Sequence, residues 1–251
     1  MLMHPTLARL QTLKLGGMAA ALADQLALPE AEGLAFLERL GLLVDREETE
    51  RCSRRLTTRL RAAALREQAT IEDLDLRSPR GLDRALVLSL ASCDWIRRRR
   101  NVLIFGPTGT GKTYLGCALA HSACREDFSA LYVRLPRLLA DLDLARMDGR
   151  FGKLLAKLAR TDLLVLDDFG LAPLGDRERH DLLEILEDRH GRRSTIVTSQ
   201  LPWASWHASV GDPTLADAIL DRLVHNAYKI EFAGESLRKR QALSEHDHEG
   251  A

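Results

Sequence analysis

The apolar residues in the first part of the chain follow the spacing of amphipathic helices. Between residues 5 and 69, apolar side chains recur at intervals of three and four residues, as at Phe36 and Leu40. This interval places the apolar side chains on one face of a helix. Proline and glycine interrupt the pattern at Pro29 and Gly41. We therefore expect three or four short helices in this region.

The second part of the chain has a different pattern, in which short apolar runs alternate with helix-period segments. Residues 71–81, which mix acids, proline and glycine, form a connector between the two parts. After a helix over residues 82–97, we expect strands over residues 101–105, 130–134, 163–167, 194–198 and 228–232. This alternation predicts an α/β fold with a parallel sheet covered on both faces. We expect a helical module over residues 1–72, an α/β domain over residues 73–240 and a polar tail over residues 241–251.

A glycine-rich segment directly after the first expected strand has the spacing of a phosphate-binding loop. The segment GPTGTGKT fits the pattern G-x-x-x-x-G-K-[ST] and leads into a helix-period segment. Its glycines allow backbone N–H groups and the N-terminus of the next helix to point at phosphate oxygens. Lys112 is expected to reach the β- and γ-phosphates of ATP, and Thr113 to ligate Mg²⁺. The expected nucleotide contacts are Gly106, Pro107, Thr108, Gly109, Thr110, Gly111, Lys112, Thr113 and Tyr114.

Two adjacent acids lie at the C-terminal end of the third expected strand, in the segment LLVLDDFG. Ligands of open α/β sheets bind at the carboxyl ends of the strands, which is where both acids lie. Asp167 suits the role of Mg²⁺ ligand. Asp168 is the candidate that orients or deprotonates the attacking water, although glutamate is the usual residue for this task. A helix cap or turn residue is the alternative interpretation of Asp168.

The composition of the chain narrows the class of protein. Lys and Arg together number 36, Asp and Glu also number 36, and 45% of the residues are hydrophobic, which is typical of a folded globular chain. The cysteines show neither zinc-ligand spacing nor a disulfide framework. No apolar run reaches the ~18 residues of a membrane span, and the first residues do not resemble a secretion signal. We expect a cytoplasmic protein without a membrane partner.

One segment of the first part is strongly basic. Residues 51–66 hold six arginines and no acid. On a helix, their spacing suits a row of phosphates on duplex DNA, without base-specific contacts. The expected DNA contacts in this segment are Arg51, Arg54, Arg55 and Arg59. Glutamates at the start of the same helix and arginines towards its end also satisfy the helix dipole, so both interpretations stay open.

The motifs together resemble a known family. The segments GPTGTGKT, LLVLDDFG, STIVTSQLP and DRL…ESLRKR are similar to those of AAA+ ATPases of the DnaC-like helicase-loader clade, and most closely to the IstB-type helper ATPases of insertion-sequence transposition. The resemblance implies a P-loop fold, ATP and Mg²⁺ as cofactors, ATP hydrolysis, assembly on duplex DNA and assistance to a transposase in target selection. The alternatives are a replicative helicase loader and, less closely, a small-molecule P-loop kinase.

The resemblance also assigns individual residues. Gln200 matches the sensor I residue, which contacts the γ-phosphate or its water, and Arg238 matches sensor II. Arg222 matches the arginine finger, which implies a homo-oligomer with head-to-tail contacts. Arg150 and Lys153 lie on an extra helix that faces DNA in relatives. Arg222 and Arg238 each have an acid nearby in sequence, so solvated ion pairs are the alternative. Only residues 233–251 follow the last expected strand, so we expect no substantial C-terminal lid.

Overall fold

The computed structural model describes residues 4–28, 33–76 and 81–234, which form two compact units. The first unit comprises residues 1–58 and the second residues 59–251. The division falls inside one helix, α3 (Phe36–Ala63), whereas the change in composition suggests a boundary near residue 72. The residues between these two positions already belong to the second unit, where Ala63 and Ala69 are buried.

The first unit consists of α1 (Pro5–Thr12), α2 (Gly16–Ala27) and the first part of α3. The α3 helix is 28 residues long, so the expectation of short helices is wrong for this segment. A single glycine costs a helix only about 1 kcal/mol relative to alanine, which explains why Gly41 does not end it. The carboxylate of Glu47 in α3 accepts hydrogen bonds from the backbone of Gly17, at 2.8 Å, and of Met18, at 3.2 Å. It thereby caps the N-terminus of α2.

The contact between α2 and α3 predicts opposite outcomes for two glycine substitutions. A Cβ atom at Gly17 would lie 2.6 Å from the Cα atom of Glu47, whereas one at Gly41 meets no heavy atom within 4 Å. We expect Gly17→Ala to destabilise the first unit by about 1–3 kcal/mol, as overpacking does. Gly41→Ala should stabilise α3 by about 0.5–1 kcal/mol. Urea unfolding followed by helix circular dichroism measures both, and equal midpoints for the two variants would contradict this packing.

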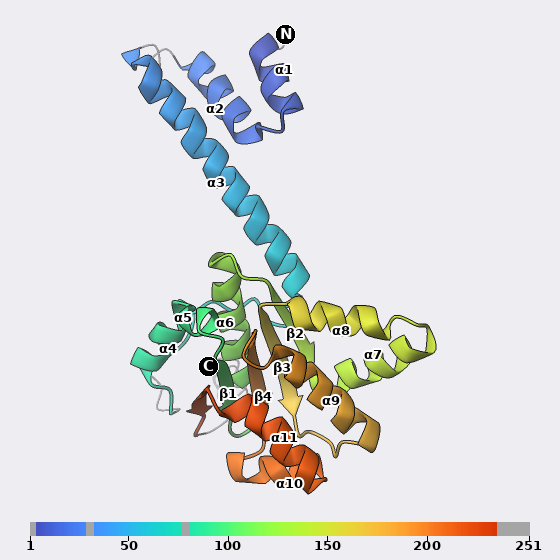
Figure 1. The fold of residues 1–251 in the computed structure, drawn as a ribbon. Helices are drawn as coiled ribbons and strands as arrows, with labels where there is room; N and C mark the ends of the chain where they lie inside the picture. The colour runs from blue at the N-terminus through green and yellow to red at the C-terminus, as the bar shows by residue number, and fades with distance from the viewer. Residues whose placement is uncertain (1–3, 29–32, 77–80, 235–251) are drawn as a thin grey trace, which may run out of the picture. The chain divides into compact units, whose positions relative to one another are not determined.

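The second unit contains a five-stranded parallel sheet with the order β2-β3-β4-β1-β5. Figure 1 shows the strands side by side within this unit. The prediction of five strands in a parallel sheet is confirmed, with ends that differ by at most two residues. Most strand residues are buried, because helices cover both faces. The strands are β1 (Asn101–Phe105), β2 (Ala130–Arg134), β3 (Leu163–Phe169), β4 (Ser194–Ser199) and β5 (Ala227–Glu231).

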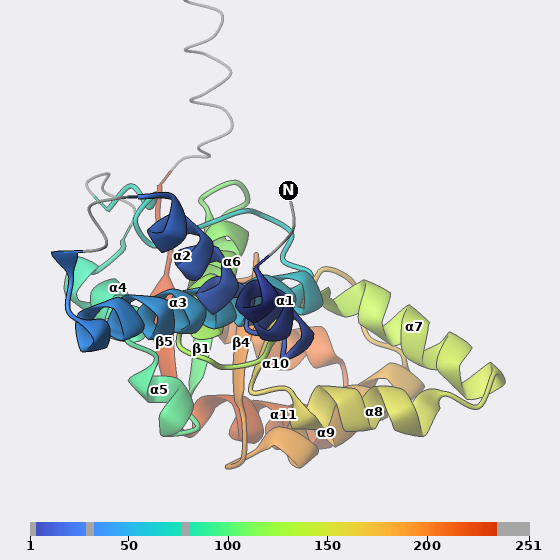
Figure 2. The ribbon, with the colours of Figure 1, turned by 90° about the horizontal axis from the view of Figure 1, so that it is seen from above.

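Helices lie on both faces of the sheet, and Figure 2 shows the same ribbon from above. One face packs on α6 (Lys112–Arg125), and α4 (Arg84–Ala91) packs on α6 in turn. The helix expected over residues 82–97 is two helices, because Cys93 has a left-handed backbone (φ +60°) between α4 and α5 (Asp94–Arg97). The opposite layer contains α7 (Leu135–Met147), α8 (Phe151–Arg160), α9 (Asp176–Arg189), a 3-10 turn (Trp203–Ser205), α10 (Trp206–Val210) and α11 (Pro213–Val224).

The strand order brings three chain segments to one edge of the sheet. Because all strands are parallel, the loop after β1 and the ends of β3 and β4 lie at the same carboxyl edge. The β4 strand lies between β3 and β1, and Phe105 is opposite Ser199 in the register. Within the part of the chain that the structure describes, no helix has both the length and the apolarity needed to cross a membrane.

Candidate nucleotide-binding site

The loop between β1 and α6 has the backbone conformation that its glycines predict. Gly106, Gly109 and Gly111 adopt φ values of +139°, +81° and +103°. A Cβ atom at Gly106 would lie 2.2 Å from the carbonyl oxygen of Phe232, so only glycine fits at this position. The loop leads directly into the N-terminus of α6, where free N–H groups and the helix dipole favour a phosphate.

Lys112 places its ammonium group inside this loop. The residue is 7% exposed, and Nζ donates hydrogen bonds to the carbonyl oxygens of Gly106, at 2.7 Å, and Pro107, at 2.6 Å. Burial lowers the pKa of Lys112, whereas the negative charges of Asp167 and Asp168 act to raise it. The two carboxylates therefore favour the charged form of the lysine beside the phosphate-binding loop.

Asp167 lies beneath the loop at the end of β3 and is almost fully buried. The hydroxyl of Thr113 lies 3.1 Å from both of its carboxylate oxygens. The Tyr132 hydroxyl donates to Oδ2 at 2.5 Å, and the Thr198 hydroxyl donates to Oδ1. Burial, together with the hydrogen bond to Asp167, raises the pKa of Tyr132, so its hydroxyl stays protonated. The hydroxyl of Thr113 and the carboxylate of Asp167 are oxygen ligands of the kind that Mg²⁺ prefers, so the two residues fit this ion.

Asp168 follows in a left-handed backbone conformation, with φ +66°. Its side chain is 16% exposed, and Oδ2 accepts a hydrogen bond from Nε of Arg134 at 2.7 Å. Its backbone N–H donates to the Thr198 hydroxyl at 3.3 Å. The carboxylate is thus near the phosphate-binding loop but is engaged in an ion pair with β2.

The polar end of β4 reaches the site through two residues. The Thr108 hydroxyl donates to Oε1 of Gln200 at 2.7 Å, so the candidate sensor touches the phosphate-binding loop. Thr198 bonds to Asp167, as described above. Ser199 instead turns away, and its hydroxyl donates to the carbonyl oxygen of Phe169 at 2.8 Å.

Arg222 lies at the opposite edge of the sheet from the phosphate-binding loop. Its carbonyl oxygen accepts a hydrogen bond from the Asn101 side chain at 3.1 Å, and Asn101 begins β1, whereas the loop follows the end of β1. The guanidinium donates to Glu187 at 2.6 Å and lies 3.6 Å from Asp221. Arg222 therefore cannot reach the phosphates of its own site. Arg238 lies outside the described residues.

Most of the basic residues that we expect to contact DNA have acidic partners. Arg51 pairs with Glu47 and Arg54 with Glu50, each one helical turn away. Arg59 pairs with Asp127 at 2.6 Å, and Arg150 pairs with Asp148. Among the described residues, Arg55 and Lys153 form no ion pair with an acid. These partners reduce the net positive charge that the sequence suggests.

Two residues that contact the acids of the site, Tyr132 and Arg134, are not predicted by the sequence patterns. Both lie on β2, and the register places Arg134 opposite Asp167. Their contact with the acids depends on β2 being the neighbour of β3, which local sequence patterns do not reveal. The signal that could have found them is the polar character of residues near the end of an otherwise apolar strand.

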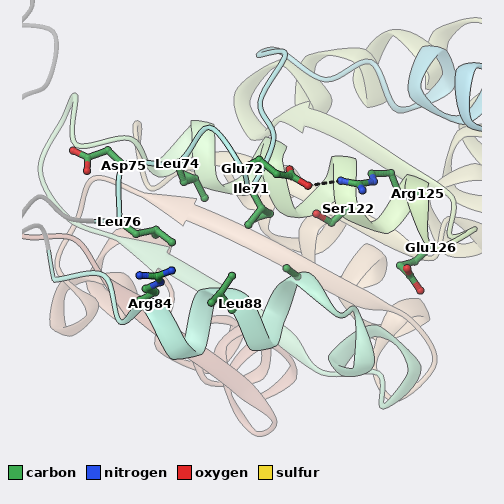
Figure 3. Close-up of a pocket in the computed structure, with 11 residues that line it drawn as sticks. Ile71, Glu72, Leu74, Asp75, Leu76, Arg84, Leu88, Ser122, Arg125 and Glu126 are labelled. Carbon is green, nitrogen blue, oxygen red and sulfur yellow. Dashed lines mark hydrogen bonds and ion pairs between the residues drawn. The ribbon is translucent and has the colours of Figure 1, made fainter.

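A separate hollow of about 610 Å³ lies at the far end of α6. The described residues that line it come from residues 71–76, from α4 and from the last turn of α6, and none belongs to the loop of residues 106–113. Figure 3 shows the ion pair between Glu72 and Arg125 within it, at 2.6 Å. Arg125 is about 20 Å along the helix from Lys112, at 1.5 Å per residue. This hollow is therefore distinct from the phosphate-binding loop.

The fold and the site together define a P-loop nucleotide-binding protein of the AAA+ class. Solved structures with this fold include DnaI, with a TM-score of 0.59 and 24% identity, covering 66% of this chain and 92% of that chain. The DnaC helicase loader has a TM-score of 0.51 and 18% identity, covering 63% of this chain and 95% of that chain. At these identities, the likeness concerns the fold alone.

Sequence comparison identifies the family within this class. The family model of the IstB-like ATP binding protein matches residues 8–245. A putative insertion sequence ATP-binding protein of Sinorhizobium fredii is 57% identical over 96% of this chain and 98% of its own length. The IS1162 putative ATP-binding protein of Pseudomonas fluorescens is 52% identical over 85% of this chain and 93% of its own. The chain belongs to the family of IstB-like ATP-binding proteins, which confirms the resemblance inferred from its motifs.

Proposed function

We propose that the protein is an Mg²⁺-dependent ATPase that assembles head to tail on duplex DNA and assists a transposase in selecting its target. The observation that carries this proposal is the separation of two parts of one catalytic site. Thr113 and Asp167 meet at the carboxyl edge of the sheet, whereas Arg222 lies at the opposite edge. Two copies of the chain are needed to bring these parts together.

The residues at the carboxyl edge of the sheet have separate roles in ATP hydrolysis. Lys112 and the amides of the loop bind the phosphates, and Thr113 and Asp167 hold the metal ion. When bound, Mg²⁺ neutralises negative charge on the transferring phosphoryl group. Asp168 orients or deprotonates the attacking water, which requires its carboxylate to be shared with, or released from, Arg134. Hydrogen-bonded to Thr108, Gln200 is held beside the γ-phosphate position.

The position of Arg222 supports head-to-tail assembly. A guanidinium supplied by a neighbouring subunit stabilises charge in the transition state of phosphoryl transfer. The edge of the sheet that carries Arg222 and the edge that carries the phosphate-binding loop are different surfaces. Each subunit would therefore contact the next one in the same head-to-tail orientation. Heterologous contacts of this kind produce rings or open helices.

We place DNA on the basic residues and the transposase on the N-terminal module of residues 1–72. Arg55 and Lys153 support the placement of DNA, because both are exposed and form no ion pair with an acid in the described chain. Phe36 and Leu37 support the placement of the transposase on the N-terminal module, since these apolar side chains are 76% and 75% exposed. The relatives are named insertion sequence ATP-binding proteins, which supports a role in transposition. The proposed DNA contacts are Arg51, Arg54, Arg55, Arg59, Arg150 and Lys153.

The test is ATPase activity and DNA binding with duplex DNA over a series of salt concentrations. We expect duplex DNA to stimulate hydrolysis, and six phosphate contacts to give a slope near −5 for log affinity against log salt, at ~0.9 per contact. A double variant, Arg150→Glu with Lys153→Glu, should reduce the slope by about 2. Arg177→Glu, at an exposed position of α9, is the control for charge alone.

Two results would contradict the DNA part of this proposal. One is ATP hydrolysis that does not respond to duplex DNA at any salt concentration. The other is tight binding to a replicative helicase without binding to duplex DNA, which would favour the helicase loader.

A further inference from the structure

We propose that Tyr132 is a positioning residue for Asp167 and sets the affinity of the nucleotide site for Mg²⁺. This inference rests on the proposed function, because it takes Asp167 as a ligand of the metal ion. Within the described parts of the chain, Tyr132 forms no hydrogen bond to the loop of residues 106–113, so it acts through the carboxylate of Asp167.

The carboxylate of Asp167 is held from both neighbouring strands. On one side, β2 contributes Tyr132, which is 8% exposed and donates to Oδ2 at 2.5 Å. On the other side, β4 contributes Thr198, whose hydroxyl donates to Oδ1. Since β3 lies between β2 and β4, the two donors fix opposite ends of the carboxylate group. The plane of the group therefore cannot turn without breaking one of these hydrogen bonds.

A basic residue that precedes the sheet lies near the tyrosine hydroxyl. Arg66 lies near Tyr132 and Asp167, and both neighbours act to raise the pKa of its guanidinium. The chain around Arg66 is anchored in the second unit by the buried side chains of Ala63 and Ala69. The positive charge of Arg66 thus lies next to the hydrogen bond from Tyr132 to the proposed metal ligand, Asp167.

Fixing the carboxylate matters because Mg²⁺ demands near-ideal octahedral geometry. A ligand that is free to rotate loses entropy when the ion binds, whereas one that is already oriented does not. Removing hydrogen-bond partners of metal ligands typically costs ~10–100-fold in metal affinity. We therefore expect loss of the Tyr132 hydroxyl to weaken Mg²⁺ binding by about tenfold, while contacts of the loop with the nucleotide persist.

The experiment compares the wild-type chain with Tyr132→Phe and a matched control, Tyr228→Phe. The Tyr228 hydroxyl accepts a hydrogen bond from Arg100 at 3.1 Å, and its strand position is opposite Val102 near the start of β1, away from Asp167. Binding of a fluorescent ATP analogue is titrated with MgCl₂, and also measured in EDTA. Tyr132→Phe should raise the MgCl₂ midpoint about tenfold and leave binding in EDTA unchanged. Tyr228→Phe should leave both quantities at their wild-type values.

A second variant, Arg66→Gln, removes the positive charge beside the Tyr132 hydroxyl without altering the tyrosine ring. It should shift the MgCl₂ midpoint in the same direction but less far. Equal midpoints for the wild type and Tyr132→Phe would overturn the inference, as would equal shifts in Tyr132→Phe and Tyr228→Phe. If Tyr132→Phe does not fold, an unchanged midpoint in Arg66→Gln overturns it instead. If the wild type itself shows no Mg²⁺-dependent binding of ATP, the proposed function fails.

Discussion

A Lys112→Ala variant is expected to bind ATP ~10²–10⁴-fold more weakly than the wild type and to show no measurable hydrolysis. The ammonium already lies within the loop, bonded to the carbonyl oxygens of Gly106 and Pro107, so it is positioned to exchange these partners for phosphate oxygens. Two charge-assisted hydrogen bonds contribute about 1.5–3 kcal/mol each, and each 1.4 kcal/mol is about tenfold in affinity. Equilibrium titration with a fluorescent ATP analogue measures the loss.

Lys229→Ala serves as the control for the removal of one positive charge. Lys229 is an exposed residue of β5, and its ammonium lies 4.4 Å from the centre of the Trp203 ring, so it takes no part in the loop. Its ATP affinity should equal that of the wild type. Undiminished ATP affinity in Lys112→Ala would contradict the assignment of residues 106–113 as the phosphate-binding loop.

An Arg222→Ala variant is expected to bind ATP normally but to lose ~10³-fold or more of its hydrolysis rate, the usual effect of removing an arginine finger. Wild-type activity per subunit should also rise with protein concentration, because each site needs a neighbour. Mixing Arg222→Ala with Lys112→Ala should restore activity, since the first variant keeps its loop and the second keeps its finger. Random assembly of equal amounts predicts recovery to about a quarter of the wild-type rate.

The variant Glu187→Gln tests whether Arg222 acts as an arginine finger or only forms an ion pair with Glu187. Glu187 accepts a hydrogen bond from Arg222 at 2.6 Å, and this pair raises the pKa of Arg222 while lowering that of Glu187. If Arg222 served only to pair with Glu187, the two variants would behave alike. We expect Glu187→Gln to retain hydrolysis. No hydrolysis in the mixture of Arg222→Ala and Lys112→Ala, or wild-type activity per subunit that is independent of protein concentration, would contradict a site shared between subunits.

The strands and the phosphate-binding loop are predictable because their signals are local. Runs such as residues 101–105 are apolar throughout, and the motif at residues 106–113 has a fixed spacing. Asp167 is predictable for the same reason, since it ends an apolar run. Its contact with Thr113 follows from the parallel sheet that these signals predict.

The remaining features depend on contacts between distant parts of the chain. The hydrogen bond from Tyr132 to Asp167 requires β2 to lie beside β3, and the ion pair of Arg59 with Asp127 joins α3 to the turn after α6. Neither is visible in local spacing. The continuity of α3 through Gly41 differs from the expectation of short helices, because a single glycine weakens a helix without ending it.

The backbone conformation at Asp168 affects which acidic residue this position can hold. With φ at +66°, this position favours glycine, asparagine and aspartate, whose short side chains tolerate a left-handed conformation better than longer ones do. Glutamate, the more familiar acid for water activation, would enter this conformation at a greater energetic cost. The shorter side chain at this position thus fits the irregular register near the end of β3, and a longer one would require this part of the strand to be rebuilt.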